Sequence, residues 1–274
     1  MKITDHLAAQ MLSRRARAGR EAVAKAEREV TTGRRVNQPS DDPTAYATGL
    51  RARDGSRRAA EHRASADRGT EMLDAAASAL DRGHELLSRA RALAMTQSAP
   101  TSTAASRGAA AAELDAMRTE LTRLRATEVH GEPVFVAANA ARRIEVGPGV
   151  MATTSSNGDA AFAGPIDLDA TLSGLASELR AGQGDAARAR IDTLVSGLRQ
   201  LEGGIAETGA QRATLALSAH LAEEAETRFE ESLNDALGAD PVRSMSSLMA
   251  RETALRTSLE VGARLMRPML ADKL

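Results

Sequence analysis

Residues 32–43 read TGRRVNQPSDDP, and they hold most of the helix-ending and helix-starting signals in the first hundred residues. Glycine adopts the left-handed conformation without a steric penalty from Cβ, so Gly33 predicts the end of a preceding helix. Pro39 disfavours helical backbone at the residue before it. Ser40 or Asp41 can then cap a second helix, with Pro43 in its first turn. The stretch therefore predicts a short extended joint between two helices.

Long helices are predicted on both sides of this joint. In residues 1–32, small or apolar residues recur at alternating spacings of three and four, which is the spacing of a coiled coil. This stripe consists of Leu12, Ala16, Gly19, Val23, Ala26 and Val30. Residues 44–97 keep the same spacing, and the polar turn at 98–103 leads into a returning helix over 104–127. Helices this long need partner helices, so we expect a helical bundle.

The second half of the chain also predicts long helices, including one at its end. Asp167 or Asp169 can cap a helix that runs to Arg180, and residues 185–237 predict another long helix. Asp240 and Pro241 open a last helix, whose apolar seam is broken by Glu252 and Gly262 and contains Met245, Leu248, Leu255, Leu259, Met266 and Met269. Pro268 leaves it open whether the final turn is helical. The stripes of the first and last helices predict that the two terminal segments pair.

Residues 130–166 switch to a period of two, which is typical of strands. Short strands are predicted at 134–136 and 143–146, with a turn at 147–149. A second hairpin is predicted to pair residues 150–154 with 160–162 across Asn157 and Gly158, because Asn-Gly is a strong hairpin turn.

Composition narrows the class of protein. The 274 residues carry 36 basic and 37 acidic side chains, so no net field favours nucleic acid or an anionic membrane. Only one Tyr and three Phe are present, too few for a β-sandwich or an aromatic ligand pocket. The absence of cysteine excludes disulfides and thiolate metal sites. The first residues lack the apolar core of a signal peptide, and no apolar run is long enough to cross a membrane.

No catalytic arrangement is predicted. The five histidines are scattered, and His84-Glu85 lacks the second histidine four residues on that a zinc protease helix needs. The glycines at 147–149 have neither the lysine nor the strand–helix context of a phosphate loop. We therefore predict a protein that is not an enzyme, with no cofactor, no metal and no catalytic residue.

The joint closely resembles the one near the N-terminus of flagellin-type proteins of the bacterial flagellum. The residues that carry this resemblance are Gly33, Arg35, Asn37, Asp41, Asp42 and Pro43. A second run, LSRARALAMTQ at 87–97, resembles the end of the first long body helix of flagellins. That likeness makes Arg89, Arg91 and Gln97 possible subunit contacts, although arginines on a solvated helix face explain the two arginines equally well.

Three further likenesses follow, and the first of them is weakened by two replaced residues. Residues 208–212, TGAQR, resemble the V-G-A-R motif of the returning body helix, with two letters replaced. The run from Arg143 to Phe162 and the first four residues are more like the family's hook-associated junction members than flagellin itself. The resemblance implies a structural, extracellular protein that leaves the cell through a type III export channel without losing a signal peptide.

The expected fold is mainly α: a long antiparallel helical bundle with paired terminal helices and a small β-hairpin element in the middle. We expect terminal arms at 1–40 and 240–274 that form an inner-tube domain, a helical body at 41–129 and 167–239, and the β element at 130–166. Leu12, Val23, Val30, Met245, Leu248, Leu255, Leu259 and Met266 are the expected assembly residues.

The resemblance implies a junction protein that connects a hook-side adaptor to the flagellin filament. The flagellin subunit itself and a cytosolic coiled-coil adaptor are the alternatives. Implied partners are further copies in a ring or short tube, a neighbouring hook-associated junction protein, flagellin and an export chaperone, but neither nucleic acid nor membrane.

Overall fold

The computed structural model describes the backbone of residues 2–271 and the side chains of residues 7 and 10–264. The fold is mainly helical, as predicted, with a few short strands in the middle of the chain. The helices are α1 (Lys2–Thr32), α2 (Pro43–Gln97), α3 (Ala104–Arg125), α4 (Gly158–Phe162), α5 (Leu168–Arg180), α6 (Gly184–Leu237) and α7 (Pro241–Ala271). The six long helices confirm the six predicted from periodicity, and α7 continues through Pro268.

Local capping decides where these helices begin and end. Gly33 has a φ of 65° directly after α1, as predicted for a glycine that ends a helix. Asp167 and Asp240 accept backbone N–H bonds at the starts of α5 and α7. The cap predicted for α2 is wrong. Asp42, not Ser40 or Asp41, accepts the Ala45 N–H at 3.0 Å, because Asp41 is bonded within the joint.

The strands are β1 (Glu128–Val129), β2 (Glu132–Pro133), β3 (Phe135–Val136), β4 (Arg143–Gly147), β5 (Val150–Thr153) and β6 (Ser156–Asn157), with a 3₁₀ turn at Ala138–Ala140. β1 pairs with β2 and β4 with β5, both antiparallel, so the predicted turn at 147–149 is confirmed. β3 pairs with β6 in parallel.

The second predicted hairpin is wrong. Asn157 accepts the Ala160 N–H at 3.1 Å and caps α4, so Gly158 begins a helix instead of turning between strands. The Phe162 ring then meets the Phe135 ring edge-on, with centroids 5.0 Å apart. A Cβ on Gly158 would lie 2.9 Å from the Phe135 Cβ, so this glycine serves close approach and not a hairpin turn.

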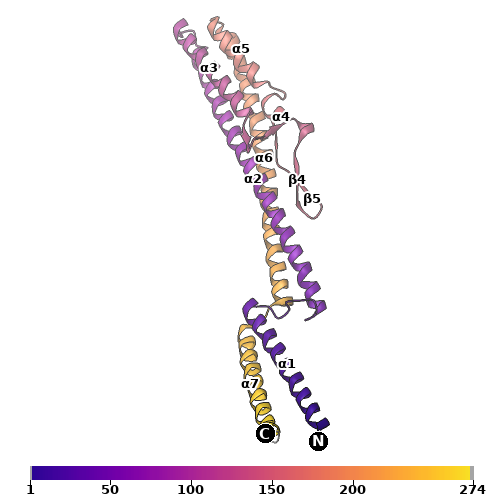
Figure 1. The fold of residues 1–274 in the computed structure, drawn as a ribbon. Coiled ribbons are helices and arrows are strands. Elements are labelled where there is room, and N and C mark those ends of the chain that lie inside the picture. Colours follow the sequence, from indigo (N-terminus) through magenta and orange to yellow (C-terminus); the bar gives the residue numbers. More distant parts are fainter. Residues whose placement is uncertain (1, 272–274) are drawn as a thin grey trace. The chain divides into compact units, whose positions relative to one another are not determined.

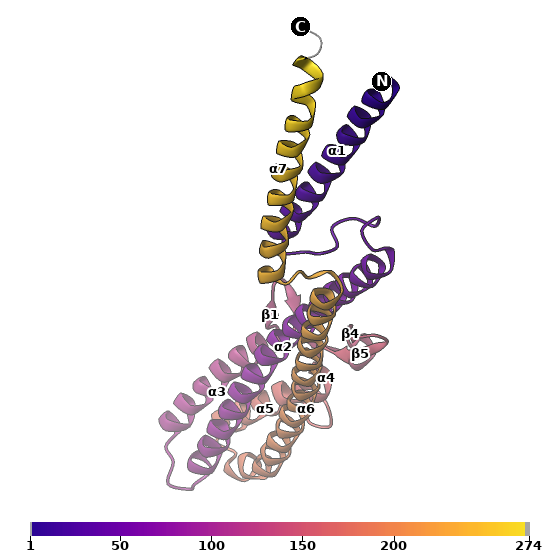
Figure 2. The same ribbon diagram turned by 90° about the horizontal axis from the view of Figure 1, so that it is seen from below.

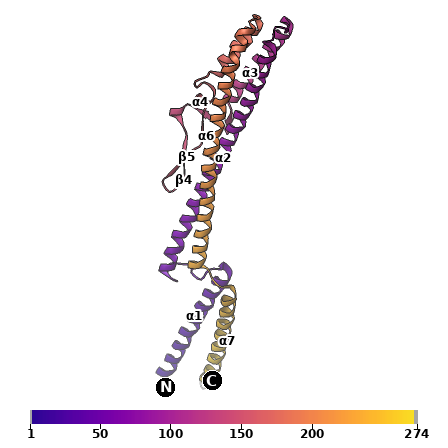
Figure 3. The same cartoon turned by 180° about the vertical axis from the view of Figure 1, so that it is seen from behind.

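The chain divides into two compact units, Met1–Arg57 with Ala225–Leu274, and Arg58–Glu224. In the second unit α2, α3, α5 and α6 enclose the main core (Figures 1 and 3). Leucines from all four helices are almost fully buried, among them Leu80, Leu114, Leu172 and Leu201. A smaller core lies where the β4–β5 hairpin covers α2 and α6, and it contains Leu73, Val146 and Leu215.

Glycines set the spacing between α2 and α6 in this unit. A Cβ on Gly69 would lie 3.0 Å from Leu215, and one on Gly197 would lie 3.2 Å from Leu87. The large side chain therefore comes from α6 in one case and from α2 in the other. The two helices approach closely because leucines of each fill the space left by glycines of the other.

Candidate assembly site

Helices α1 and α7 lie side by side in the first unit and run antiparallel (Figures 1 and 2). Their contact repeats the exchange of glycine and leucine. A Cβ on Gly19 of α1 would lie 2.9 Å from Leu255, and a Cβ on Gly262 of α7 would lie 2.7 Å from Leu12. Each helix therefore offers one glycine to a leucine of the other, seven residues from its own leucine.

The same register sets the rest of this contact. Continued along both helices, it predicts that Ala26 lies opposite Leu248 and Val30 opposite Ser244, which again pairs one small with one large side chain. Ala26 and Ser244 are buried, and Leu248 is half-buried. The residues that decide the close approach are Gly19 and Gly262, which the heptad pattern marks only as weak positions because a glycine buries no side chain.

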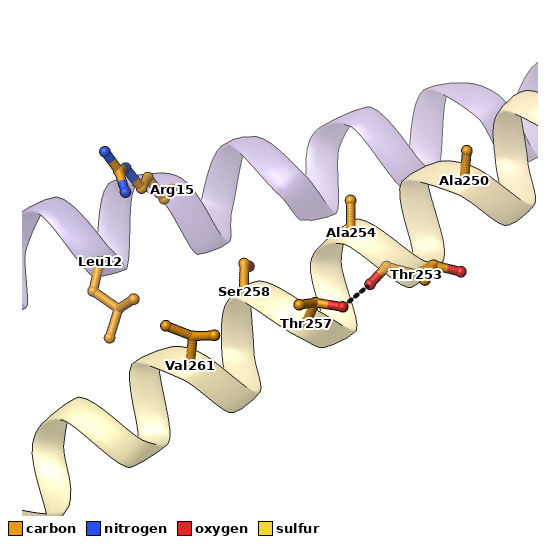
Figure 4. A pocket seen from close by; sticks show the side chains of 8 residues that line it. All are labelled: Leu12, Arg15, Ala250, Thr253, Ala254, Thr257, Ser258 and Val261. Carbon is orange, nitrogen blue, oxygen red and sulfur yellow. Dashed lines mark hydrogen bonds between the residues drawn. The ribbon is translucent and has the colours of Figure 1, made fainter.

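A groove of about 600 Å³ runs beside the α1·α7 contact. Figure 4 shows Leu12 of α1 and Val261 of α7 facing this space, with Arg15 at one side. The α7 wall consists mainly of small side chains, including Ala254 and Ser258. The groove therefore has the shape and apolar character of a seat for another helix.

Large apolar side chains are concentrated on this helix pair. Half of those exposed in the described part of the chain lie on α1 and α7, namely Leu7, Met11, Val242, Met245, Met249, Leu259 and Val261. Two helices bury only the faces that they turn to each other. Large apolar side chains concentrated on one helix pair are typical of an interaction site.

The predicted seam residues differ in exposure. Leu12, Leu248 and Leu255 are half-buried in the α1·α7 contact, together with Val23 and Val30 of α1. Met245 and Leu259 are 47% and 41% exposed. The side chain of Met266 lies outside the described residues.

Backbone hydrogen bonds hold the joint to the segment that connects α6 with α7. Arg34 and Gly238 form an antiparallel bridge, the Arg35 N–H donates to the Leu237 carbonyl at 2.8 Å, and the Ala239 N–H donates to the Gly33 carbonyl at 3.0 Å. The segment that leaves α1 is therefore bonded to the segment that enters α7. The side chain of Val36, in the joint, is only 1% exposed and so adds apolar burial to these hydrogen bonds.

Asp41 organises the inside of the joint. One carboxylate oxygen lies 2.9 Å from the Lys25 ammonium of α1, and the other accepts the Asn37 and Gln38 N–H groups at 3.2 Å. Lys25 and these two amides hold the pKa of Asp41 below its ordinary value, against the opposing effect of burial. Asn37 also donates from Nδ2 to the Arg34 carbonyl at 2.8 Å. Sequence spacing gave no signal for Lys25, because its partner is 16 residues away.

Asp42 and Arg35 form the outer edge of the joint. Asp42 accepts the Ala45 N–H, and its second oxygen lies 3.6 Å from Arg35 Nη1. The Ala45 amide and the Arg35 guanidinium lower the pKa of Asp42. Arg35 also donates to the Ala236 carbonyl at 3.2 Å, and Pro43 is the first residue of α2. All six joint residues named from the sequence thus lie together.

The remaining predicted contacts lie in the other unit, at the far end of α2. Arg89 is paired with Glu113 of α3, and Arg91 is exposed. Gln97 is half-buried and accepts a hydrogen bond from the Ser106 hydroxyl at 3.0 Å. Arg89 and Gln97 therefore have partners on the neighbouring helix within the same chain.

Comparison with known proteins identifies the family. The family model of the bacterial flagellin N-terminal helical region matches residues 3–140, just over half of the chain. The chain belongs to the bacterial flagellin family. This flagellin-family protein is a structural component of the bacterial flagellum and not an enzyme, and its place is outside the cell. No curated protein sequence matches it.

One solved structure shares the fold, and a second has a lower TM-score. A Vibrio parahaemolyticus protein described as a flagellar hook-associated protein is 16% identical, with a TM-score of 0.64 over 72% of this chain and 100% of the other. One crystal form of Xanthomonas campestris FlgL is 13% identical, with a TM-score of 0.46 over 77% of this chain and 99% of the other. Within the described residues no helix is long and apolar enough to cross a membrane.

Proposed function

We propose that this flagellin-family protein is a junction protein that connects the hook-side adaptor to the flagellin filament. The observation that carries the proposal is the α1·α7 pair, whose outer faces keep large apolar side chains in solvent. An isolated helix pair of this kind gains stability when further copies cover those faces. Assembly through the terminal helices follows from that requirement.

Two further observations favour a junction protein over the filament subunit. The Vibrio protein that shares this fold is described as hook-associated. The sequence from Arg143 to Phe162, which forms β4, β5, β6 and α4, is also more like the hook-associated members of the family. The small β element adds little bulk to the body, as suits an adaptor between two lattices.

We propose the following division of labour. Residues 1–40 and 240–274 form the inner-tube arms, 41–129 and 167–239 the body, and 130–166 a small outer element. The arms contact further copies in a ring or short tube, a neighbouring hook-associated protein and the first flagellin subunits. An export chaperone protects the apolar arms before secretion. Arg89 and Arg91 belong to a body surface available to neighbouring subunits.

Deletion of the gene tests the junction role. We expect cells with finished hooks and no filaments, which release unpolymerised flagellin into the medium. A junction protein acts in few copies, so immunoblots of wild-type flagella should show far less of it than of the filament subunit. The loss of the main flagellin-sized secreted band on deletion would instead identify the protein as flagellin. A plasmid copy of the wild-type gene is the control.

A further inference from the structure

A cavity of about 400 Å³ lies in the Arg58–Glu224 unit, between α2, the β1–β2 turn and the β4–β5 hairpin. Its volume falls in the range of small-molecule sites. Met72 and Ile144 provide apolar wall, and Arg68, His130 and Arg142 bring nitrogen donors to the lining. Glu132, the ion-pair partner of Arg142, also lines the cavity with its carboxylate. Neither the helix packing nor the terminal assembly surface uses this cavity.

The two arginines retain binding capacity. Arg142 donates from Nη1 to Glu132 at 2.7 Å and to the Met72 sulfur at 3.6 Å, while its Nε and Nη2 have no partner among the described residues. Arg68 donates to the Ser65 hydroxyl at 3.2 Å, and no carboxylate of the described chain lies within ion-pair distance of it. A guanidinium with free donors binds carboxylates in a planar, two-pronged geometry.

Thr154 forms a closed part of the cavity wall. The residue lines the cavity, is only 2% exposed, and its hydroxyl has no hydrogen-bond partner among the described residues. Its methyl group is fixed against α2, because a Cβ on Gly69 would lie 2.6 Å from it. The hydroxyl oxygen is itself shielded from solvent, so it lies behind the wall and takes no part in binding.

The β1–β2 turn also departs from what the backbone favours. His130 has a φ of 54° and Gly131 a φ of 78°, the pattern of a two-residue turn in which Asn-Gly is the preferred pair. Histidine at the first position places an imidazole at the cavity, 3.2 Å from Glu71 of α2. Asparagine would suit the turn better, so the imidazole serves something other than the turn.

We propose that this cavity binds a carboxylate. Arg142 and Arg68 hold the carboxylate oxygens, the His130 imidazole contributes to the site from the β1–β2 turn, and Met72 and Ile144 contact the carbon chain. The carboxylate belongs either to a free organic acid or to an acidic side chain of a neighbouring protein. This site does not depend on the proposed junction role.

Calorimetric titration of the full chain tests the site with two probes, citrate and N-acetylglutamate amide. We expect saturable binding, weakened about tenfold or more in Arg142→Gln and in Arg68→Gln because each removes a charged donor. Tighter citrate binding indicates a free polycarboxylic acid. Binding of blocked glutamate that is equal or tighter indicates a protein side chain.

Two controls keep the result specific. Arg82→Gln removes an exposed arginine from the same helix, 14 residues beyond Arg68, and should leave binding unchanged. His130→Asn keeps a favourable turn while it removes the imidazole, so weaker binding without a lower unfolding midpoint supports the site. No saturable binding of either probe at millimolar concentration overturns the proposal, as does an equal loss in Arg82→Gln.

Discussion

The α1·α7 pair and the part of the α2·α6 pair within Arg58–Glu224 pack by the same exchange of glycine and leucine, yet they bury very different amounts of apolar surface. Leu87, Leu201 and Leu215 are completely buried between α2 and α6, whereas Leu255 is only half-buried between α1 and α7. The reason is the number of walls. α3, α5 and the β4–β5 hairpin close the sides of the α2·α6 pair, whereas within its own unit no further helix covers the described outer faces of the α1·α7 pair.

This difference separates folding from assembly. The leucines between α2 and α6 are buried within one chain, so this pair needs no second molecule to remove them from water. The α1·α7 pair leaves large apolar side chains exposed, and another molecule can cover them. The same sequence pattern thus builds a core in one region and, in our proposal, an interface in the other.

The largest effect on stability is expected in the closed core. Leu201→Ala should lower the free energy of unfolding by about 2–5 kcal/mol, because it leaves a cavity in a fully buried layer. Denaturant unfolding followed by circular dichroism measures the change. Leu217→Ala on the same helix is the control: Leu217 is 59% exposed, so its loss should change stability by less than about 0.5 kcal/mol. Equal effects would mean that the two positions do not differ in burial.

The next effect is expected in the arms. Gly262→Leu places a side chain where Leu12 already lies, and overpacking of this kind costs about 1–3 kcal/mol. Limited proteolysis should then cut α1 and α7 faster while the Arg58–Glu224 unit keeps its thermal transition. Adding Leu12→Ala to the variant should restore protection, because it reopens the space. If the double variant is cut as fast as the single one, the proposed exchange of large and small residues is wrong.

A smaller, pH-dependent effect is expected at the joint. The pKa of Asp41 is lowered in the folded state, so its ionised carboxylate stabilises the fold at neutral pH, above the ordinary aspartate pKa of about 3.9. This stabilisation is lost as the pH falls through the lowered pKa of Asp41. Hydrogen exchange at Asn37 and Gln38 should therefore quicken only in strong acid. Asp41→Asn should remove that pH dependence, and the control Asp185→Asn, at an exposed side chain, should retain it. Unchanged acid sensitivity in Asp41→Asn would assign the transition to another group.

The smallest effect on the monomer is expected at the exposed arm face. Leu259→Lys should change monomer stability by less than about 0.5 kcal/mol, because Leu259 is already 41% exposed, but the charge should block incorporation into flagella. Electron microscopy and immunoblots of isolated flagella measure incorporation. Leu255→Lys is the matched comparison four residues earlier, where the charge should also separate α7 from α1. Normal incorporation of Leu259→Lys would exclude this face from the assembly contact.

Local chemistry made much of the fold predictable from the sequence. A helix end is predicted by Gly33, because glycine adopts a positive φ without a steric penalty. Helix starts are predicted by Asp167 and Asp240, because an aspartate cap accepts backbone N–H groups two or three residues on. The three–four spacing likewise predicts the long helices, and the joint motif points to the flagellin family. These features depend on residues a few positions apart and needed no knowledge of tertiary contacts.

Tertiary structure decided what the same local signals left open. Asn157-Gly158 has the sequence of a hairpin turn, yet the packing of Phe162 on Phe135 makes it the start of α4. Gly262 interrupts a heptad seam in the sequence, but in the fold the side chain of Leu12 packs against α7 at this glycine. The physical reason is the same in both cases: a glycine permits either an unusual backbone or a close neighbour, and only the packed structure brings that neighbour to it.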